Sequence, residues 1–292
     1  MARYCGTRNA GAQPAHEGRI FRMPESMLKK VSEELIELEA SGHTAPPFSA
    51  RYPKLNADAG YRAMRRLHQH RLTIGWKPLG RKIGFTNRTL WARYGVHEPI
   101  WGFVYDQTLI RAADNRAKVP LEGLAQPRIE AEICFGLRAP PPRSHDAHAI
   151  LAAIAWVAHS VEIVQCFHPD WKVRLPDCTA ANGLHGRLVL GTPVAVESIA
   201  HLEALLPAAR VVLRKGSKTA DEGVGANVLG SPLYSLAHLV EVLALQPDFD
   251  QLHAEEIVST GTLIDAHPVK PGETWSTAFE GLPLAGLTVT FT

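Results

Sequence analysis

Residues 127–135, PRIEAEICF, constrain the fold most strongly, because charged and apolar side chains alternate there. Side chains alternate between the two faces of a strand, so Glu130 and Glu132 would share one face with Arg128, and apolar residues would form the other. Two residues of strand span about 6.6 Å, so one cation between the carboxylates could contact both. The same pattern is typical of a half-buried strand whose polar face meets solvent. Both interpretations are open from this segment alone.

The rest of the chain predicts an α+β protein with a β-rich core and a helical N-terminal region. Helical spacing of apolar residues appears at 24–40 and 57–72, and a short helix is expected at 88–94. The apolar run 148–160 predicts a buried helix that leads directly into a strand at 161–167. A second helix is expected at 231–245, with Ser231 as its N-cap and Pro232 in its first turn. Further strands are expected at 208–214, 257–264, 274–279 and 287–292.

These elements suggest three regions along the chain. Residues 1–24 lack periodicity and are expected to form a flexible arm. Residues 25–95 would form a helical N-terminal region or lid, and residues 96–292 would form the β-rich catalytic core.

Composition and charge exclude several classes of function. Hydrophobic residues make up 46% and charged residues 21% of the 292 residues, as in an ordinary globular protein. The formal net charge is only +2, which gives no support to nucleic-acid binding by a basic face. No apolar run approaches the roughly 18 residues of a membrane span, so none is expected. The first 20 residues lack the apolar core of a signal peptide, which predicts a cytoplasmic location.

Glu162 adds a third carboxylate to the adjacent pair. It lies in the apolar run VEIVQCF at 161–167, where an isolated buried carboxylate is costly unless it is paired or binds a metal. Three acids on two core strands form an all-oxygen ligand set without His or Cys. Such a set suits a hard cation, Mg²⁺ or Mn²⁺, better than zinc.

Six segments carry a resemblance to a known family. They are GRKIGFTN (80–87), GVHEPIWGFVYD (95–106), PRIEAEICF (127–135), VEIVQCFHPDWKVRLPD (161–177), GANVLGSP (225–232) and STGTLIDAHPVKPGE (259–273). In this order they resemble the fumarylacetoacetate hydrolase superfamily, and within it the 2-keto-4-pentenoate hydratase and 4-oxalocrotonate decarboxylase group. The resemblance implies a fumarylacetoacetase-like core, a mixed β-roll or barrel. It also implies an active-site lysine, Lys82, and three metal ligands, Glu130, Glu132 and Glu162.

The resemblance further implies a lyase that acts on a small-molecule, unsaturated 2-oxo acid in the breakdown of aromatic compounds. Mg²⁺ or Mn²⁺ would withdraw electrons as a dienolate develops, which serves either hydration or decarboxylation. Lys82 would stabilise negative charge on substrate oxygens or carry a proton. Arg128, Lys172 and Asn182 are candidate substrate-binding residues, although Lys172 could equally be structural. A homo-oligomer is implied, and pairing with a related lyase subunit is an open alternative.

Two departures from the group's pattern bear on the chemistry. Hydratases of the group carry an Asp after the proline of the second segment, where this chain has Ile100, and this favours decarboxylation mildly. His185 stands where the group has small residues or Ser, so it is a candidate acid–base residue or substrate contact. The alternatives are a 2-keto-4-pentenoate-type hydratase, a fumarylacetoacetate-type C–C hydrolase and a non-catalytic partner subunit. The hydrolase would need an acid–histidine pair, for which only His43 and His185 are candidates.

Overall fold

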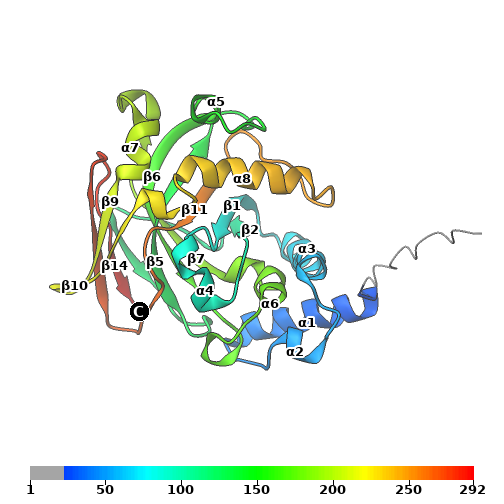
Figure 1. Ribbon diagram of the computed structural model, residues 1–292. Coiled ribbons are helices and arrows are strands. Elements are labelled where there is room, and N and C mark those ends of the chain that lie inside the picture. Colours follow the sequence, from blue (N-terminus) through cyan, green and yellow to red (C-terminus); the bar gives the residue numbers. More distant parts are fainter. Residues whose placement is uncertain (1–22) are drawn as a thin grey trace, which may run out of the picture.

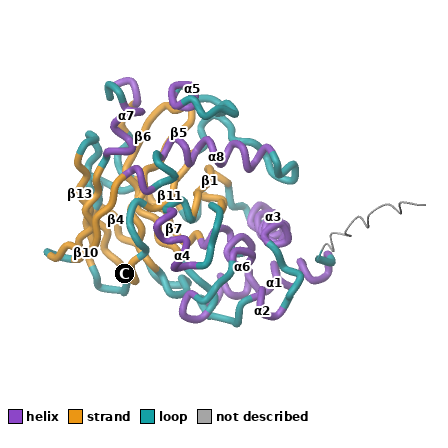
Figure 2. The backbone as a smooth tube through the Cα atoms, viewed as in Figure 1, coloured by secondary structure: helices purple, strands orange, loops and turns teal. Residues whose placement is uncertain are grey.

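The computed structural model describes residues 23–292, so the predicted arm at 1–24 lies almost entirely outside the described residues. Two β-sheets form one side of the molecule, and a group of helices from the N-terminal third lies on the other (Figures 1 and 2). Parallel and antiparallel pairs occur in both sheets. The α+β prediction is confirmed.

The larger, nine-stranded sheet positions most of the residues discussed below. Its main path runs β2-β1-β11-β5-β6-β7-β3, with β12 pairing β5 and β8 pairing β6. The strands are β1 (Pro78–Gly84), β2 (Ile100–Tyr105), β3 (Leu109–Arg111), β5 (Arg128–Leu137), β6 (Ile154–Val164), β7 (His185–Leu190), β8 (Val194–Ala195), β11 (Ile257–Thr262) and β12 (His267–Pro268).

The smaller sheet has five strands in the order β10-β9-β13-β14-β4. They are β4 (Arg116–Val119), β9 (Arg210–Lys215), β10 (Lys218–Val224), β13 (Thr274–Glu280) and β14 (Thr288–Phe291). Three of the four C-terminal predictions are confirmed within a few residues by β11, β13 and β14. The strand expected at 208–214 begins two residues later, because Ala208 ends a helix.

The helices are α1 (Glu25–Ser41), α2 (Phe48–Arg51), α3 (Ala57–Thr73), α4 (Trp91–Tyr94), α5 (Ala147–Leu151), α6 (Leu175–Ala180), α7 (Leu202–Ala208) and α8 (Pro232–Ala244). The predicted helices at 24–40, 57–72 and 231–245 match α1, α3 and α8. Ser231 caps α8 by accepting the Leu233 backbone N–H, as predicted. α1, α3 and α6 share an apolar cluster around Leu35, Phe48 and Cys178, which holds the N-terminal helices against the core.

The helix expected at 148–160 is wrong. Only α5 is helical, and β6 begins at Ile154. β6 pairs with β5 on one side and with β7 and β8 on the other, so it is a central strand that buries both faces. A central strand carries a nearly continuous apolar run, which periodicity alone does not distinguish from a buried helix.

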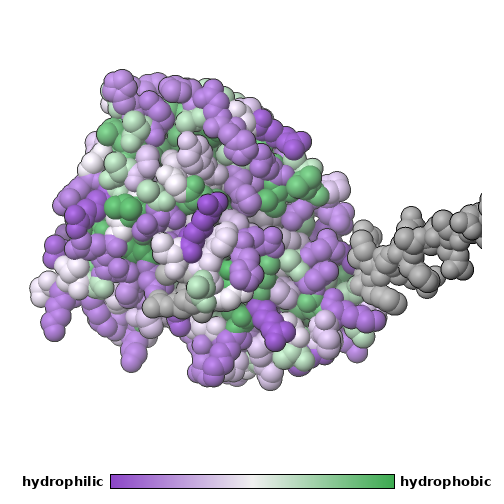
Figure 3. Space-filling model, viewed as in Figure 1, coloured by the Kyte–Doolittle hydropathy of each residue, from purple (hydrophilic) through white to green (hydrophobic). Residues whose placement is uncertain are grey.

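Within residues 23–292, no helix combines the length and apolarity that crossing a membrane requires. On the face shown in Figure 3, hydrophobic residues appear in small separate groups among hydrophilic ones. The boundary predicted at residues 95 and 96 stays a prediction, although β1 lies before it and belongs to the larger sheet.

Candidate active site

The register of β5 against β6 brings the three glutamates together. Glu130 lies directly opposite Glu162, and Glu132 lies opposite Ser160. Directly opposite residues of an antiparallel pair share a face, and residues two apart on one strand also share it. One carboxylate oxygen from each of the three glutamates lies within 4.8 Å of the others.

This cluster fits a divalent cation. Glu132 and Glu162 are fully buried, and Glu130 is half-buried. Glu132 Oε1 is buried and accepts no hydrogen bond from the described residues, so an acceptor lacks a partner at the centre of the cluster. Three carboxylates and the one ammonium paired with them leave two negative charges when all are ionised, which a divalent ion would balance. An all-oxygen donor set of this kind suits Mg²⁺ or Mn²⁺.

A bulge in β11 provides hydrogen-bond donors to the second carboxylate oxygen of Glu132, Oε2. Ser259 donates its hydroxyl to Glu132 Oε2 at 2.5 Å, and the Gly261 N–H donates to the same atom at 3.3 Å. The register of β11 against β5 shifts between Ser259 and Thr262, and Gly261 has a φ of 103°. A Cβ at Gly261 would lie 1.9 Å from the Thr86 hydroxyl oxygen, so only glycine fits this bulge.

Lys82 supplies the positive charge of the site. It lies on β1, where it pairs in parallel register with Ser259 of β11. Its Nζ lies 3.1 Å from Glu162 Oε2 and donates to the Gly183 carbonyl at 3.0 Å. Burial lowers the pKa of Lys82, but the charges of the surrounding glutamates outweigh burial and raise the pKa above its ordinary value. Lys82 is therefore a buried ammonium beside the carboxylates.

The pKa values of the three glutamates are all raised. Burial is the largest cause for each, because a charged carboxylate loses hydration in the interior. The charge of Glu132 raises the pKa of Glu130 further, and the charge of Glu162 does the same for Glu132, whose pKa rises to about 8. Without a bound cation, the cluster therefore retains protons at neutral pH.

The raised pKa of Glu132 predicts a pH dependence of stability for chelator-treated protein. The ordinary pKa is 4.5 and the folded value is about 8, so between these values the folded state holds a proton that the unfolded chain has lost. The free energy of unfolding should therefore fall as pH rises through this window, relative to Glu132→Gln, which cannot titrate there. Urea unfolding of both proteins in EDTA at pH 5, 6, 7 and 8 measures the difference. If the free energy of unfolding of the wild type minus that of Glu132→Gln stays flat or rises with pH, the raised pKa of Glu132 is contradicted.

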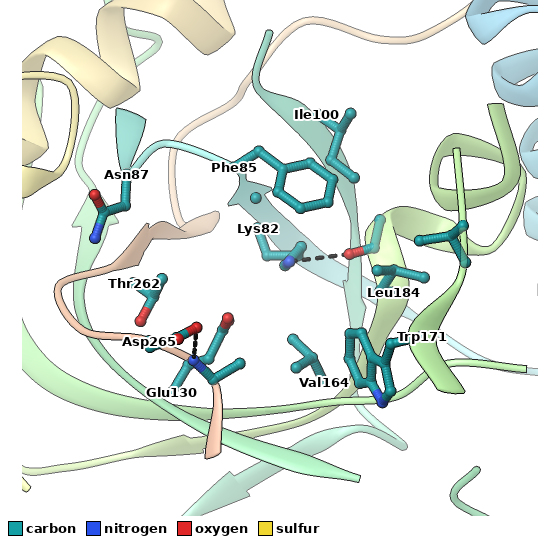
Figure 4. Close-up of a pocket in the computed structure, with 14 residues that line it drawn as sticks. Lys82, Phe85, Asn87, Ile100, Glu130, Val164, Trp171, Leu184, Thr262 and Asp265 are labelled. Atoms are coloured by element: carbon teal, nitrogen blue, oxygen red, sulfur yellow. Dashed lines mark hydrogen bonds between the residues drawn. The ribbon is translucent and has the colours of Figure 1, made fainter. Parts of the chain in front are cut away.

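A small cavity of about 50 Å³ reaches the cluster at Glu130 (Figure 4). Lys82 and Glu130 contribute its polar groups, together with Thr262, Asp265 and Asn87. Its remaining side chains are mainly apolar: Phe85, Ile100, Val164, Trp171, Val173 and Leu184. The cavity thus has a charged end next to the glutamates and hydrophobic walls.

The candidate substrate-binding residues take different positions. Arg128 and Lys172 line a wide depression of about 770 Å³, which shares Trp171, Val173 and Asp265 with the cavity. Arg128 stacks over the Trp171 ring at 4.2 Å, whereas Lys172 is exposed and pairs with Asp170. Both line this depression, and Arg128 lies two residues before Glu130 on β5.

Asn182 holds the backbone of β2. Its side-chain oxygen accepts the Phe103 N–H at 2.8 Å, and its amide donates to the Phe103 carbonyl at 3.0 Å. It lies in the short 3-10 turn Asn182–Leu184, of which Gly183 and Leu184 line the cavity. The structure thus gives Asn182 a role in positioning β2 and this turn.

His185 contacts the cluster from outside the cavity. Its Nδ1 lies 2.7 Å from Glu162 Oε1 and its Nε2 lies 2.9 Å from Thr108 Oγ1. Burial and the charge of Lys82 hold its pKa well below the ordinary value. It borders a second cavity, of about 320 Å³, together with Arg71 and Arg187. His43, the other histidine considered for a hydrolase, is exposed.

Sequence reasoning assigned no role to Ser259, Thr262 or Asp265, although all three lie in the segment STGTLID. This segment was interpreted as a strand and as part of the family resemblance, without a role for these three side chains. Ser259 is fully buried and holds Glu132, and the other two line the cavity. The signal was the concentration of hydroxyl groups around a glycine in an otherwise apolar strand, which is typical of a bulge.

Comparisons with known proteins identify relatives of this chain. No family model matches the chain. It is 30% identical over 254 residues to a 4-oxalocrotonate decarboxylase of Pseudomonas sp. strain CF600, covering 86% of this chain and 92% of the relative. It is 28% identical over 262 residues to a 2-keto-4-pentenoate hydratase of Paraburkholderia xenovorans, covering 89% of this chain and 94% of the relative.

A solved structure of 4-oxalocrotonate decarboxylase from Pseudomonas putida G7, complexed with magnesium and adipate, superposes with a TM-score of 0.83. The alignment covers 93% of this chain and 99% of that one, at 26% identity. The fold is thus that of the solved decarboxylase, and the named relatives define the class as lyases. The chain belongs to the 2-keto-4-pentenoate hydratase and 4-oxalocrotonate decarboxylase group. Its fold is also that of a solved protein of the fumarylacetoacetate hydrolase family from Yersinia pestis, with a TM-score of 0.53, as the six segments implied.

Proposed function

We propose that this chain is a divalent-metal-dependent lyase that acts on unsaturated 2-oxo acids, with decarboxylation favoured over hydration. The convergence of Glu130, Glu132 and Glu162 beside Lys82, at the charged end of an otherwise apolar cavity, carries the proposal. The relatives' names, a hydratase and a decarboxylase, and the magnesium bound by the solved relative support it.

The three glutamates would hold Mg²⁺ or Mn²⁺. Such an ion would supply a Lewis acid that polarises the bond to the 2-oxo oxygen of the substrate. Lys82 would place a positive charge near the same oxygen and stabilise the negative charge that develops there. Hydrophobic walls at Phe85, Val164 and Leu184 would hold the unsaturated carbon chain and exclude water.

Ile100 supports decarboxylation over hydration. It is buried and lines the cavity, at the position where hydratases of the group carry Asp. A carboxylate there could act as a base toward water, whereas an aliphatic side chain offers no such group. Loss of CO₂ from a dicarboxylate substrate leaves a dienolate without consuming water, so it needs no base at this point.

Two measurements test the proposed function. Chelator-treated protein should gain about 5 °C in melting temperature with saturating Mg²⁺ or Mn²⁺, because an ion that binds only the folded state stabilises it. The metal-loaded protein should then release CO₂ from 4-oxalocrotonate and act slowly on 2-hydroxypent-2,4-dienoate.

The other outcomes distinguish the alternatives. Rapid loss of 2-hydroxypent-2,4-dienoate without CO₂ release from 4-oxalocrotonate would identify a hydratase. Cleavage of an acylpyruvate into two acids would identify a C–C hydrolase. No shift with either metal and no turnover would favour a non-catalytic partner subunit. The assembly into homo-oligomers and the cytoplasmic location stay predictions, which analytical ultracentrifugation and cell fractionation would test.

A further inference from the structure

The carboxylate of Glu162 is contacted from two sides. Lys82 Nζ lies 3.1 Å from Oε2, and His185 Nδ1 lies 2.7 Å from Oε1. His185 begins β7 and pairs with Val164, two residues beyond Glu162 on the adjacent strand. Both residues are buried: Glu162 is 0% exposed and His185 is 3% exposed. His185 therefore lies behind Glu162, on the side away from the cavity.

The groups around the ring determine which of its nitrogens carries the proton. When Glu162 is ionised, as a metal ligand must be, its oxygens only accept, so His185 then carries its proton on Nδ1 and donates it to Glu162. Nε2 is then an acceptor, and it accepts a hydrogen bond from the Thr108 hydroxyl at 2.9 Å. Thr108 Oγ1 in turn accepts the Tyr105 N–H at 3.1 Å. Its own proton has two acceptors within reach, His185 Nε2 at 2.9 Å and the Tyr105 carbonyl at 3.2 Å, and a ring protonated on Nδ1 takes it at the shorter distance. The chain Thr108–His185–Glu162 thus fixes one tautomer of the ring.

The backbone of His185 is also held in place. Its N–H donates to the Asn182 carbonyl, and its carbonyl accepts Gln165 Nε2 at 3.2 Å. The ring has hydrogen-bond partners at both nitrogens and lies in the interior, so its orientation is determined by contacts on every side. Such a ring can determine the orientation of the carboxylate that it contacts.

We propose that His185 is a positioning residue: it donates Nδ1–H to Glu162 and turns the second oxygen of that carboxylate toward the cation site, while Thr108 selects the required tautomer. This inference rests on the proposed function, because it assigns Glu162 as a ligand. His185 acts through Glu162 and does not touch substrate, since it borders the second cavity rather than the one that Lys82 lines.

The test compares variants that retain or lose the Nδ1 donor. Asn at position 185 places an amide N–H close to the position of Nδ1, whereas Gln reaches toward Nε2 and Thr108. We therefore expect His185→Ala and His185→Gln to weaken Mn²⁺ binding by about 10- to 100-fold, and His185→Asn to stay within about threefold of the wild type. Isothermal titration of chelator-treated protein with Mn²⁺ measures this without turnover.

Thr108 provides a second, independent pair of variants. Thr108→Val removes the hydroxyl that selects the tautomer, and should weaken Mn²⁺ binding about 3- to 10-fold, whereas Thr108→Ser retains it. Turnover gives a further readout. At saturating Mn²⁺ the kcat of His185→Ala should return to within about threefold of the wild type, because a positioning residue affects occupancy of the site rather than the reacting atoms.

The outcomes separate this inference from the proposed function. Wild-type protein that binds no Mn²⁺ would overturn both. Wild-type binding with equal affinity in His185→Ala, or equal losses in His185→Asn and His185→Gln, would overturn the positioning role alone. A kcat that stays low at saturating Mn²⁺ would also overturn it, by making His185 part of the chemistry. If His185→Ala does not fold, the Thr108→Val and Thr108→Ser pair decides: equal Mn²⁺ affinities overturn the proposal.

Discussion

Glu132→Gln is expected to abolish metal binding and turnover while leaving the fold intact. Ser259 and the Gly261 N–H both donate to Glu132 Oε2, and a Gln carbonyl oxygen can accept both bonds in the same place. The Gln amide nitrogen then replaces Oε1, the atom without a hydrogen-bond partner among the described residues. A donor group would face the cation site where an acceptor is required. We expect turnover to fall by at least about 10³-fold.

Three measurements check this result. Isothermal titration with Mn²⁺ should show no binding, the turnover assay should show no activity, and the melting temperature in EDTA should equal or exceed that of the wild type. The last expectation follows because the substitution removes one of three crowded acids. Glu280→Gln, an exposed change at the end of β13, is the matched control and should alter none of the three. Full activity in Glu132→Gln would refute the site assignment.

Lys82→Met should abolish turnover but retain the metal, which distinguishes it from Glu132→Gln. Removing the ammonium takes a positive charge from beside the 2-oxo oxygen, and we expect kcat/KM to fall by about 10²- to 10⁴-fold. It also removes the cation that lies 3.1 Å from Glu162 Oε2 and competes with the metal for that carboxylate. Mn²⁺ affinity should therefore stay the same or increase.

Steady-state kinetics and Mn²⁺ titration of Lys82→Met test both halves of this expectation. Lys118→Met, an exposed lysine of β4 in the smaller sheet, controls for the loss of a charge and should match the wild type. If Lys82→Met loses metal and activity together, Lys82 holds the cluster in shape rather than assisting the reaction. If activity is unchanged, the lysine has no role in turnover.

The fold could be predicted largely where one face of an element meets solvent. α1, α3 and α8 each combine an apolar stripe with polar residues, and their predicted ranges agree with the structure. The prediction was wrong at 148–160, where both faces of β6 are buried. There the apolar residues are nearly continuous, so neither a helical nor a strand period stands out. Pairing with β5 and β7 makes the segment a strand.

The candidate site was predictable in its residue types and not in its contacts. Alternation along β5 placed Glu130 and Glu132 on one face, and burial singled out Glu162. The roles of Asn182 and His185 depend on partners far away in the sequence, Phe103 and Thr108 among them, and no local pattern reports such contacts. Ser259 was missed for the same reason, since its partner Glu132 lies 127 residues earlier.

The pairing of Glu132 with β11 also sets when a growing chain can first hold an ion. On a translating ribosome, β5 and β6 emerge with their acids long before Ser259 and Gly261 are synthesised. Until β11 inserts between β1 and β5, Lys82 is paired only with β2, which does not adjoin the strands that carry the acids. The third acid, Glu162, therefore waits for roughly 100 residues of further synthesis before Ser259 and Gly261 can complete the surroundings of the cluster.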